Sequence, residues 1–117
     1  MRNSLFPWFV VVPDTSEIEF YKLESDLQTK VLNQINLVSR FIEQAYSTDK
    51  INIASIGNIV SQLHVHIVGR YKSDICWPGV VWGVKEFKQY EPDQIKQIKN
   101  KLLVTFEGQF QVTKDGG

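Results

Sequence analysis

The sequence predicts an α+β domain in which an antiparallel sheet packs against one long helix and a shorter C-terminal helix. Short apolar and β-branched segments, bounded by proline and glycine, are typical of strands. One long segment repeats its apolar residues at steps of three and four, which is typical of an amphipathic helix. A second such repeat follows Pro92. At 117 residues the chain fits a single domain, which is expected to span residues 1–117.

Three segments are expected to form the strands. Phe6–Val12 is aromatic and β-branched and stops at Pro13. Lys50–Ile56 and Val60–Arg70 alternate in polarity, and Gly57–Asn58 between them predicts a tight turn, so these two strands should form an antiparallel hairpin. The side chains of the last strand that should face the helix are those of Leu63, Val65 and Ile67.

The long helix is expected at Ser25–Tyr46. Ser25 and Gln28 have the spacing of a capping box, in which each side chain satisfies a backbone N–H near the helix start. A second helix is expected to begin near Pro92, which suits a first turn, and to end near Gly108. The predicted buried stripe of the long helix is Leu27, Val31, Ile35, Val38, Ile42 and Ala45.

Charge and composition narrow the function classes. The chain has 13 basic and 13 acidic residues, and this balance argues against binding of long nucleic acid, which needs a basic surplus. No apolar run is long enough to span a bilayer, so no membrane partner is expected. The single cysteine, Cys76, cannot form an internal disulfide, which fits a reducing compartment, and we expect a cytoplasmic protein.

The candidate chemistry centres on the two histidines of the chain, His64 and His66. Alternation along a strand directs both imidazoles to one face, about 6–7 Å apart along the backbone. Gln62 precedes them on that face, and Asn52 of the neighbouring strand can share it. The glycine of the Gly57–Asn58 turn lets backbone N–H groups approach a ligand, so the face is suited to a phosphate-sized anion.

A neutral imidazole is a competent nucleophile toward phosphorus. It needs a lone pair on one ring nitrogen, while the N–H of the other nitrogen is held, preferably by a backbone carbonyl. The second imidazole and the nearby amides can then contact the phosphoryl oxygens and the leaving group. This scheme requires neither a metal nor another cofactor.

Two other interpretations of the histidine pair remain open from the residues alone. The first is a structural pair whose hydrogen bonds are satisfied within the hairpin, with no chemistry. The second is a zinc site, for which Cys76 is the obvious third ligand. Arg70 is expected to be a surface residue that closes its strand, although it could help to neutralise a phosphate. Trp77 is either a loop anchor or a cover over a ligand.

The segment from Lys50 to Arg70 reads KINIASIGNIVSQLHVHIVGR. It resembles the signature of the histidine triad (HIT) family of nucleotidyl hydrolases and transferases, which is His-x-His-x-His followed by apolar residues. The likeness is greatest to a bacterial branch that reads QLHVH, in which Gln62 takes the place of the first histidine, and which resembles diadenosine tetraphosphate hydrolase-like proteins. The likeness extends from about Phe6 to about Phe106 and includes the Trp-Pro-Gly loop.

The resemblance implies a role for each site residue. His64 would attack the α-phosphorus of a nucleotide conjugate and form a nucleotidyl-histidine, and His66 would contact the phosphate or assist the leaving group. The main-chain carbonyl of Gln62 would orient the nucleophilic ring. The residues implied to hold phosphate oxygens are Asn52, Gly57, Asn58 and Val60.

The resemblance also implies the ligands and the assembly. The ligands would be purine nucleotides, dinucleoside polyphosphates or nucleoside phosphoramidates, and the assembly a homodimer. Family members carry further residues before the strand that begins here at Phe6, so the domain is expected to lack the N-terminal part of the family's domain. The glutamine at position 62 and this short N-terminus favour an alternative function, a non-catalytic nucleotide-binding or dimeric interaction module.

Overall fold

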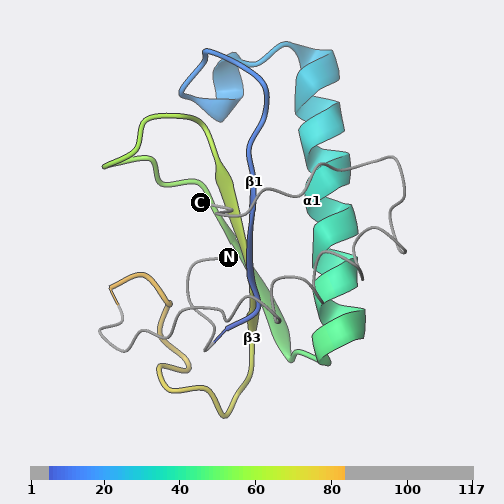
Figure 1. Ribbon diagram of the computed structural model, residues 1–117, viewed down its shortest axis with the longest axis vertical. Helices are drawn as coiled ribbons and strands as arrows, with labels where there is room; N and C mark the ends of the chain where they lie inside the picture. Colours follow the sequence, from blue (N-terminus) through green and yellow to red (C-terminus); the bar gives the residue numbers. More distant parts are fainter. Residues whose placement is uncertain (1–5, 84–117) are drawn as a thin grey trace, which may run out of the picture.

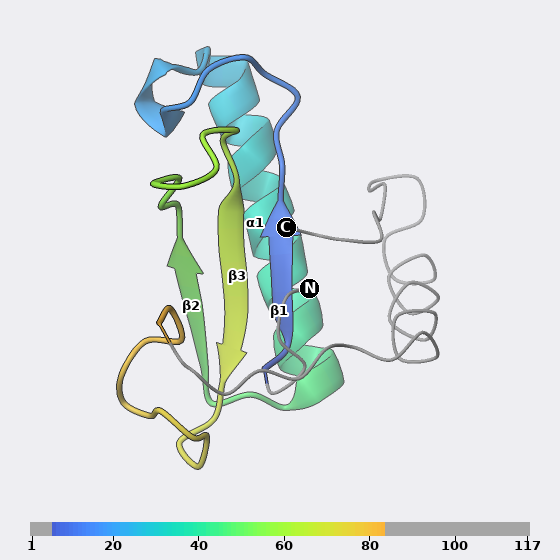
Figure 2. The same cartoon turned by 60° about the vertical axis from the view of Figure 1, so that its left-hand side comes forward.

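The computed structural model of the protein describes residues 6–83. In chain order these residues form strand β1 (Trp8–Val11), a short 3₁₀ helix η1 (Phe20–Lys22), helix α1 (Ser25–Tyr46), strand β2 (Lys50–Ala54) and strand β3 (Val65–Arg70). Helix α1 runs along one face of the sheet (Figure 1) and the strands lie side by side (Figure 2), which is the expected α+β class. The second helix expected after Pro92 lies outside the described residues.

The sheet is antiparallel, and its strand order β1-β3-β2 makes β3 the central strand of the described part (Figure 2). His66 is paired on both sides, with Val10 of β1 and Ala54 of β2. All residues of β3 are buried. The central strand therefore carries its polar side chains into the interior, where each must find a hydrogen-bond partner.

Helix α1 has the predicted bounds, but it does not begin with a capping box. The N-cap residue is Glu24, and it makes no side-chain capping hydrogen bond. The side-chain amide of Gln28 instead donates to the main-chain oxygens of Leu23 (2.8 Å) and Tyr21 (3.4 Å). The prediction of a capping box between Ser25 and Gln28 was therefore wrong, because the side chain of Gln28 is bonded to carbonyl oxygens of the segment that precedes the helix.

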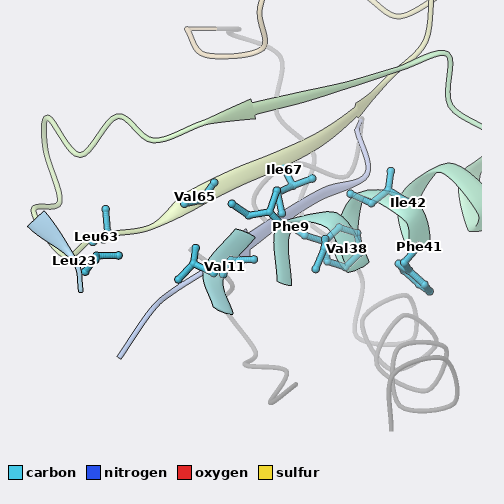
Figure 3. Close-up of a cluster of buried hydrophobic side chains, with 11 residues drawn as sticks. Phe9, Val11, Leu23, Val38, Phe41, Ile42, Leu63, Val65 and Ile67 are labelled. Atoms are coloured by element: carbon cyan, nitrogen blue, oxygen red, sulfur yellow. The ribbon is translucent and has the colours of Figure 1, made fainter. Parts of the chain in front are cut away.

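The main core lies between α1 and one face of the sheet (Figure 3). Val65 and Ile67 of β3, together with Leu63 just before it, point toward α1 as alternation predicts. The buried residues of α1 are Val31, Ile35, Val38, Phe41 and Ile42. Among the described residues, no helix combines the length and the hydropathy needed to cross a membrane.

One residue of the predicted helical stripe, Ala45, is exposed rather than buried, so that prediction was wrong. At this end of α1 the core is filled by three aromatic rings instead. Phe9, Phe41 and Tyr46 lie with their ring centroids 5.9, 6.5 and 6.3 Å apart. These large side chains occupy the space between α1 and β1 that a methyl group would leave empty.

The strands are shorter than predicted, and the loop between β2 and β3 is longer. The pairing of β2 with β3 ends at Ala54 and His66, so residues 55–64 connect the strands. The prediction of a tight turn at Gly57–Asn58 was therefore wrong. Beyond Ala54 the strands are no longer paired through their main chains. Here a side-chain hydrogen bond links the two segments, in which Ser55 Oγ donates to the main-chain oxygen of His64 at 3.0 Å.

The other face of the sheet carries a second apolar cluster. Its buried members are Phe6, Trp8, Val68 and Val81, and Trp82 packs against them. Residues 71–83, which follow β3, thus return over the face that does not contact α1. The histidine pair lies on this second face.

Candidate active site

The two imidazoles lie next to each other. His66 belongs to β3, and His64 is the residue immediately before this strand. The two ring centroids are 4.8 Å apart, with an angle of 81° between the ring planes. Val65 between them points into the core under α1. The two residues are 8% and 2% exposed, respectively. Alternation has thus brought both rings to one face, and both are set into the body of the domain.

The ring of His64 is oriented by the main chain. Its Nδ1 lies 2.6 Å from the main-chain oxygen of Gln62. A carbonyl oxygen only accepts, so Nδ1 carries the proton in this contact. In the neutral ring the lone pair is then on Nε2, which is the arrangement that a nucleophilic imidazole requires.

The side chain of Gln62 does not turn toward the imidazoles. Its Nε2 donates to the main-chain oxygens of Thr15 at 3.3 Å and of Pro13 at 3.5 Å. The residue thus offers its main-chain oxygen to His64 and ties its side chain to the loop after β1. With Ser55 Oγ bonded to the main-chain oxygen of His64, the segment that carries the ring is held from two directions.

The ring of His66 is held by a side chain. The indole Nε1 of Trp8 donates to His66 Nδ1 at 3.0 Å, and both residues are buried. Trp82 lies on another side of the His66 ring, with a centroid distance of 5.6 Å. Trp8 was not predicted from the sequence to be a site residue. The available signal was alternation, which places Trp8 on the same face as Val10, the partner of His66.

Arg70 is not a surface residue, and that prediction was wrong. It is 1% exposed, and its guanidinium donates to both carboxylate oxygens of Asp74, at 2.8 and 3.0 Å. It also lies 5.5 Å from the ring centroid of Trp77 and 5.7 Å from that of Phe6. These partners compensate the desolvation of a buried charge. Trp77 therefore contacts Arg70 and anchors the loop after β3.

The ion pair between Arg70 and Asp74 shifts the pKa of both side chains. The side-chain hydrogen bond to Asp74 raises the pKa of Arg70, although burial opposes this effect. Burial alone would raise the pKa of Asp74. The hydrogen bonds from Arg70 and from the backbone N–H of Tyr71 outweigh it, and hold the pKa of that carboxyl below its usual value. Both groups are thus stabilised in their charged forms.

Asn52 shares the face of the histidines but is drawn toward Arg70. It pairs with Val68 of β3, two residues beyond His66. Its Oδ1 accepts from Arg70 Nη1 at 2.8 Å. The amide oxygen is thus committed to the cation, and the Nδ2 donors are the part of Asn52 suited to an anion.

The expected phosphate-binding turn lies in the loop between β2 and β3. Gly57 has a φ of 66°, in the left-handed region that favours glycine. Gly57, Asn58 and Val60 are all exposed. The chain continues from this turn through Gln62 to His64. Asn52 lies apart from the turn, on strand β2.

The residues described here do not form a metal centre. Between residues 6 and 83, no three His, Cys, Asp or Glu side chains are grouped so that they could hold a metal ion. Cys76, the third ligand of the zinc interpretation, has its Sγ 3.4 Å from Arg70 Nη2. Cys76 thus belongs to the Arg70 cluster.

The comparisons with known proteins identify the family of the chain. The HIT domain family model matches residues 1–73. Three solved histidine triad proteins are similar over most of their length. The protein from Marinobacter aquaeolei is 34% identical, with a TM-score of 0.86, and the match covers 94% of this chain and 81% of that one. A search of curated proteins finds no significant match.

The two other structures are histidine triad proteins from Sinorhizobium meliloti and Bradyrhizobium japonicum. For the Sinorhizobium meliloti protein the identity is 31%, the TM-score 0.85, and the coverage 91% of this chain and 79% of that one. For the Bradyrhizobium japonicum protein the identity is 32% and the TM-score 0.84, and the match covers 90% of this chain and 79% of that one. The fold is that of these histidine triad proteins. The chain belongs to the HIT family, and this membership points to a nucleotide-binding hydrolase or transferase.

Proposed function

We propose that the protein is a hydrolase or transferase that acts at the α-phosphate of nucleotide conjugates, through a covalent nucleotidyl-histidine formed on His64. The substrate classes are dinucleoside polyphosphates and nucleoside phosphoramidates. The observation that carries the proposal is the 2.6 Å contact between His64 Nδ1 and the main-chain oxygen of Gln62. It holds the Nδ1 proton, and so leaves the Nε2 lone pair for attack.

The reaction has two steps. First, His64 Nε2 attacks the α-phosphorus, so that a P–N bond forms and the bond to the leaving group breaks. The leaving group departs with the bonding electron pair and takes a proton from solvent. Second, water attacks the phosphorus, the electron pair of the P–N bond returns to Nε2, and a water proton is released to solvent. The products are a nucleoside monophosphate and the protonated leaving group, and an acceptor other than water would make the protein a transferase.

The remaining site residues hold the phosphoryl group. His66 contacts a phosphoryl oxygen beside the nucleophile. The ring centroid of His66 lies 4.8 Å from that of His64. Gln62 acts through its main-chain oxygen. The other groups that hold phosphoryl oxygens are the Asn52 amide and the main-chain N–H groups of Gly57, Asn58 and Val60. Fixed donors of this kind stabilise the charge that develops on phosphorus in the transition state.

The test is covalent labelling. The purified protein is incubated with adenosine phosphoramidate or diadenosine tetraphosphate radiolabelled at the α-phosphate, and then denatured rapidly. We expect labelled protein and released AMP from the wild type, and neither from His64→Ala. Ser61→Ala is the matched control, because Ser61 is an exposed residue of the same segment.

Two outcomes would overturn the proposal. Saturable binding of AMP without release of product would make the protein a binding module. Label that persists in His64→Ala would assign the nucleophile to another residue. For either comparison, the circular dichroism spectrum of His64→Ala must first show that the variant is folded.

A second copy of the chain is the protein partner that we propose. Among residues 6–83, β2 is an outer strand, and large apolar side chains are exposed on it and on the loop that follows. Ile53 is 52% exposed, Ile59 97% and Val60 50%. A homodimer would remove such a surface from water. We expect Ile59→Lys to lower the mass measured by light scattering to that of a monomer, whereas Tyr21→Lys, at an exposed position in η1, should not.

A further inference from the structure

The hydrogen bond between Trp8 and His66 joins two buried side chains that are 58 residues apart. Trp8 is 6% exposed and His66 2%. Their strands are neighbours in the sheet, and the ring centroids are 5.7 Å apart in an edge-on arrangement. Neither side chain can leave this contact without disturbing the face of the sheet, so the bond is a fixed feature of the site.

The direction of this bond is determined by its chemistry. An indole N–H donates and has no lone pair with which to accept. His66 Nδ1 must therefore accept, and it cannot carry a proton while the 3.0 Å bond exists. We propose that Trp8 is a positioning residue, which holds His66 in the neutral tautomer with its proton on Nε2.

The two histidines are thereby held in opposite tautomers. In His64 the main-chain oxygen of Gln62 places the proton on Nδ1, and in His66 the Trp8 indole places it on Nε2. One ring presents a lone pair at Nε2 and the other presents a donor at the same ring position. A pair of neutral rings, 4.8 Å apart, thus combines a nucleophile with a hydrogen-bond donor.

A functional consequence follows, and it rests on the proposed function. With its proton on Nε2, His66 donates a hydrogen bond to a phosphoryl oxygen. It does not act as a general acid or base, because release of the Nε2 proton would leave an imidazolate, and uptake of a second proton would break the bond to Trp8. The specific role of Trp8 is to reserve His66 for charge stabilisation.

The test determines the tautomer of each histidine. The protein is labelled with ¹⁵N-histidine, and two-bond ¹⁵N–¹H correlation spectra are recorded near neutral pH. The chain has two histidines, and His64→Ala assigns their signals. We expect His66 to show an unprotonated Nδ1 and a protonated Nε2, and His64 to show the reverse. In Trp8→Phe the fixed pattern of His66 should be lost and replaced by the average of two tautomers. This readout does not depend on catalysis, so a protein without turnover would refute the proposed function and leave the tautomer testable.

Trp82→Phe is the matched control. Trp82 also lies against the His66 ring, but its own buried Nε1 has no hydrogen-bond partner among the described residues. Its replacement should therefore leave the His66 signals in the same tautomer. If Trp8→Phe fails to fold, the wild-type protein supplies a second measurement, a scalar coupling across the hydrogen bond between Trp8 Nε1 and His66 Nδ1. A protonated Nδ1 on His66 in the wild type, an absent coupling, or an unchanged tautomer in folded Trp8→Phe would each overturn the proposal.

Discussion

The main-chain oxygen of Gln62 lies 2.6 Å from Nδ1 of His64. The group that orients the candidate nucleophile is thus part of the backbone, and every residue type at position 62 would supply it. The side chain of Gln62 points elsewhere, toward the main-chain oxygens of Pro13 and Thr15. If Gln62 stands in the place of a histidine, as the sequence resemblance implies, this substitution therefore leaves the orienting oxygen in place.

Replacement of the side chain alone should therefore spare the chemistry. We expect Gln62→Ala to keep covalent labelling and turnover of adenosine phosphoramidate. Its free energy of unfolding should fall by about 0.5–1.5 kcal/mol, because the hydrogen bonds to the loop after β1 are lost. Steady-state kinetics and urea unfolding measure the two effects. A loss of turnover as complete as that of His64→Ala would instead give the Gln62 amide a direct role.

Ser55 supports the nucleophile from the other side. Its Oγ donates to the main-chain oxygen of His64 at 3.0 Å, at the point where the pairing of β2 with β3 ends. Ser55→Ala should lower the free energy of unfolding by about 1 kcal/mol. It should also lower kcat more than it changes KM, because the ring is held less firmly in its attacking position.

The exposed Ser61 provides the control for this variant, since Ser61→Ala removes a hydroxyl from the same segment. Both variants would be compared by urea unfolding and by turnover of adenosine phosphoramidate. Equal behaviour of Ser55→Ala and Ser61→Ala would show that the bond to His64 contributes neither to stability nor to rate.

The buried pair of Arg70 and Asp74 predicts stability that is lost in acid. The pKa of Asp74 lies below its ordinary value of 3.8, so the folded protein binds this proton more weakly than the unfolded chain does. The stabilisation is present above the ordinary value and is lost as the pH falls through it toward the lower folded-state pKa. Near neutral pH, Asp74→Asn should cost about 3 kcal/mol, since a buried cation loses its charged partner.

The pH dependence separates this ion pair from simple packing. Urea unfolding would be measured from neutral to strongly acidic pH for the wild type and for Asp74→Asn. The variant should lose less stability on acidification, because the proton-linked contribution is already absent. Asp14→Asn, at an exposed carboxylate, controls for the loss of one negative charge. An equally steep acid loss in Asp74→Asn would assign the acid sensitivity to other groups.

Local patterns were sufficient where the structure depends on one segment meeting one neighbour. The apolar steps of the long helix predicted the bounds Ser25–Tyr46 because most of its stripe faces a single core, with Ala45 as the exception. Alternation in the predicted strand Val60–Arg70 likewise separated Val65 from His64 and His66, because a strand has only two faces. The resemblance, and not a local pattern, led us to expect the Gln62 carbonyl next to His64, and the two groups are in contact at 2.6 Å.

The rest depends on contacts between distant segments, which no local pattern encodes. The bond from Trp8 to His66 exists only because β1 pairs with β3, and the sequence did not specify that strand order. Arg70 is buried because Asp74, Asn52 and two aromatic rings converge on it. A strand-ending arginine without such partners would lie in water, which was the expectation.

Gly69 allows the ends of α1 and β1 to approach β3 closely. A Cβ at this position would lie 2.6 Å from Thr48 Cγ2, 2.7 Å from Ile42 Cγ2 and 2.7 Å from Pro7 Cγ. Favourable carbon contacts are about 3.5–4.0 Å, so at least one neighbour would have to move. We expect Gly69→Ala to lower the free energy of unfolding by about 1–3 kcal/mol in urea.

A double-mutant cycle with Thr48→Ser identifies the cause of that loss. Serine removes Cγ2, the atom nearest to the added methyl group, and keeps the hydroxyl. If the methyl groups collide, Gly69→Ala should cost less in the Thr48→Ser background, with a coupling of about 0.5 kcal/mol or more. Part of the loss should remain, because Ile42 and Pro7 are still close. Strictly additive effects would instead show that the Thr48 methyl group does not contribute to the cost of Gly69→Ala.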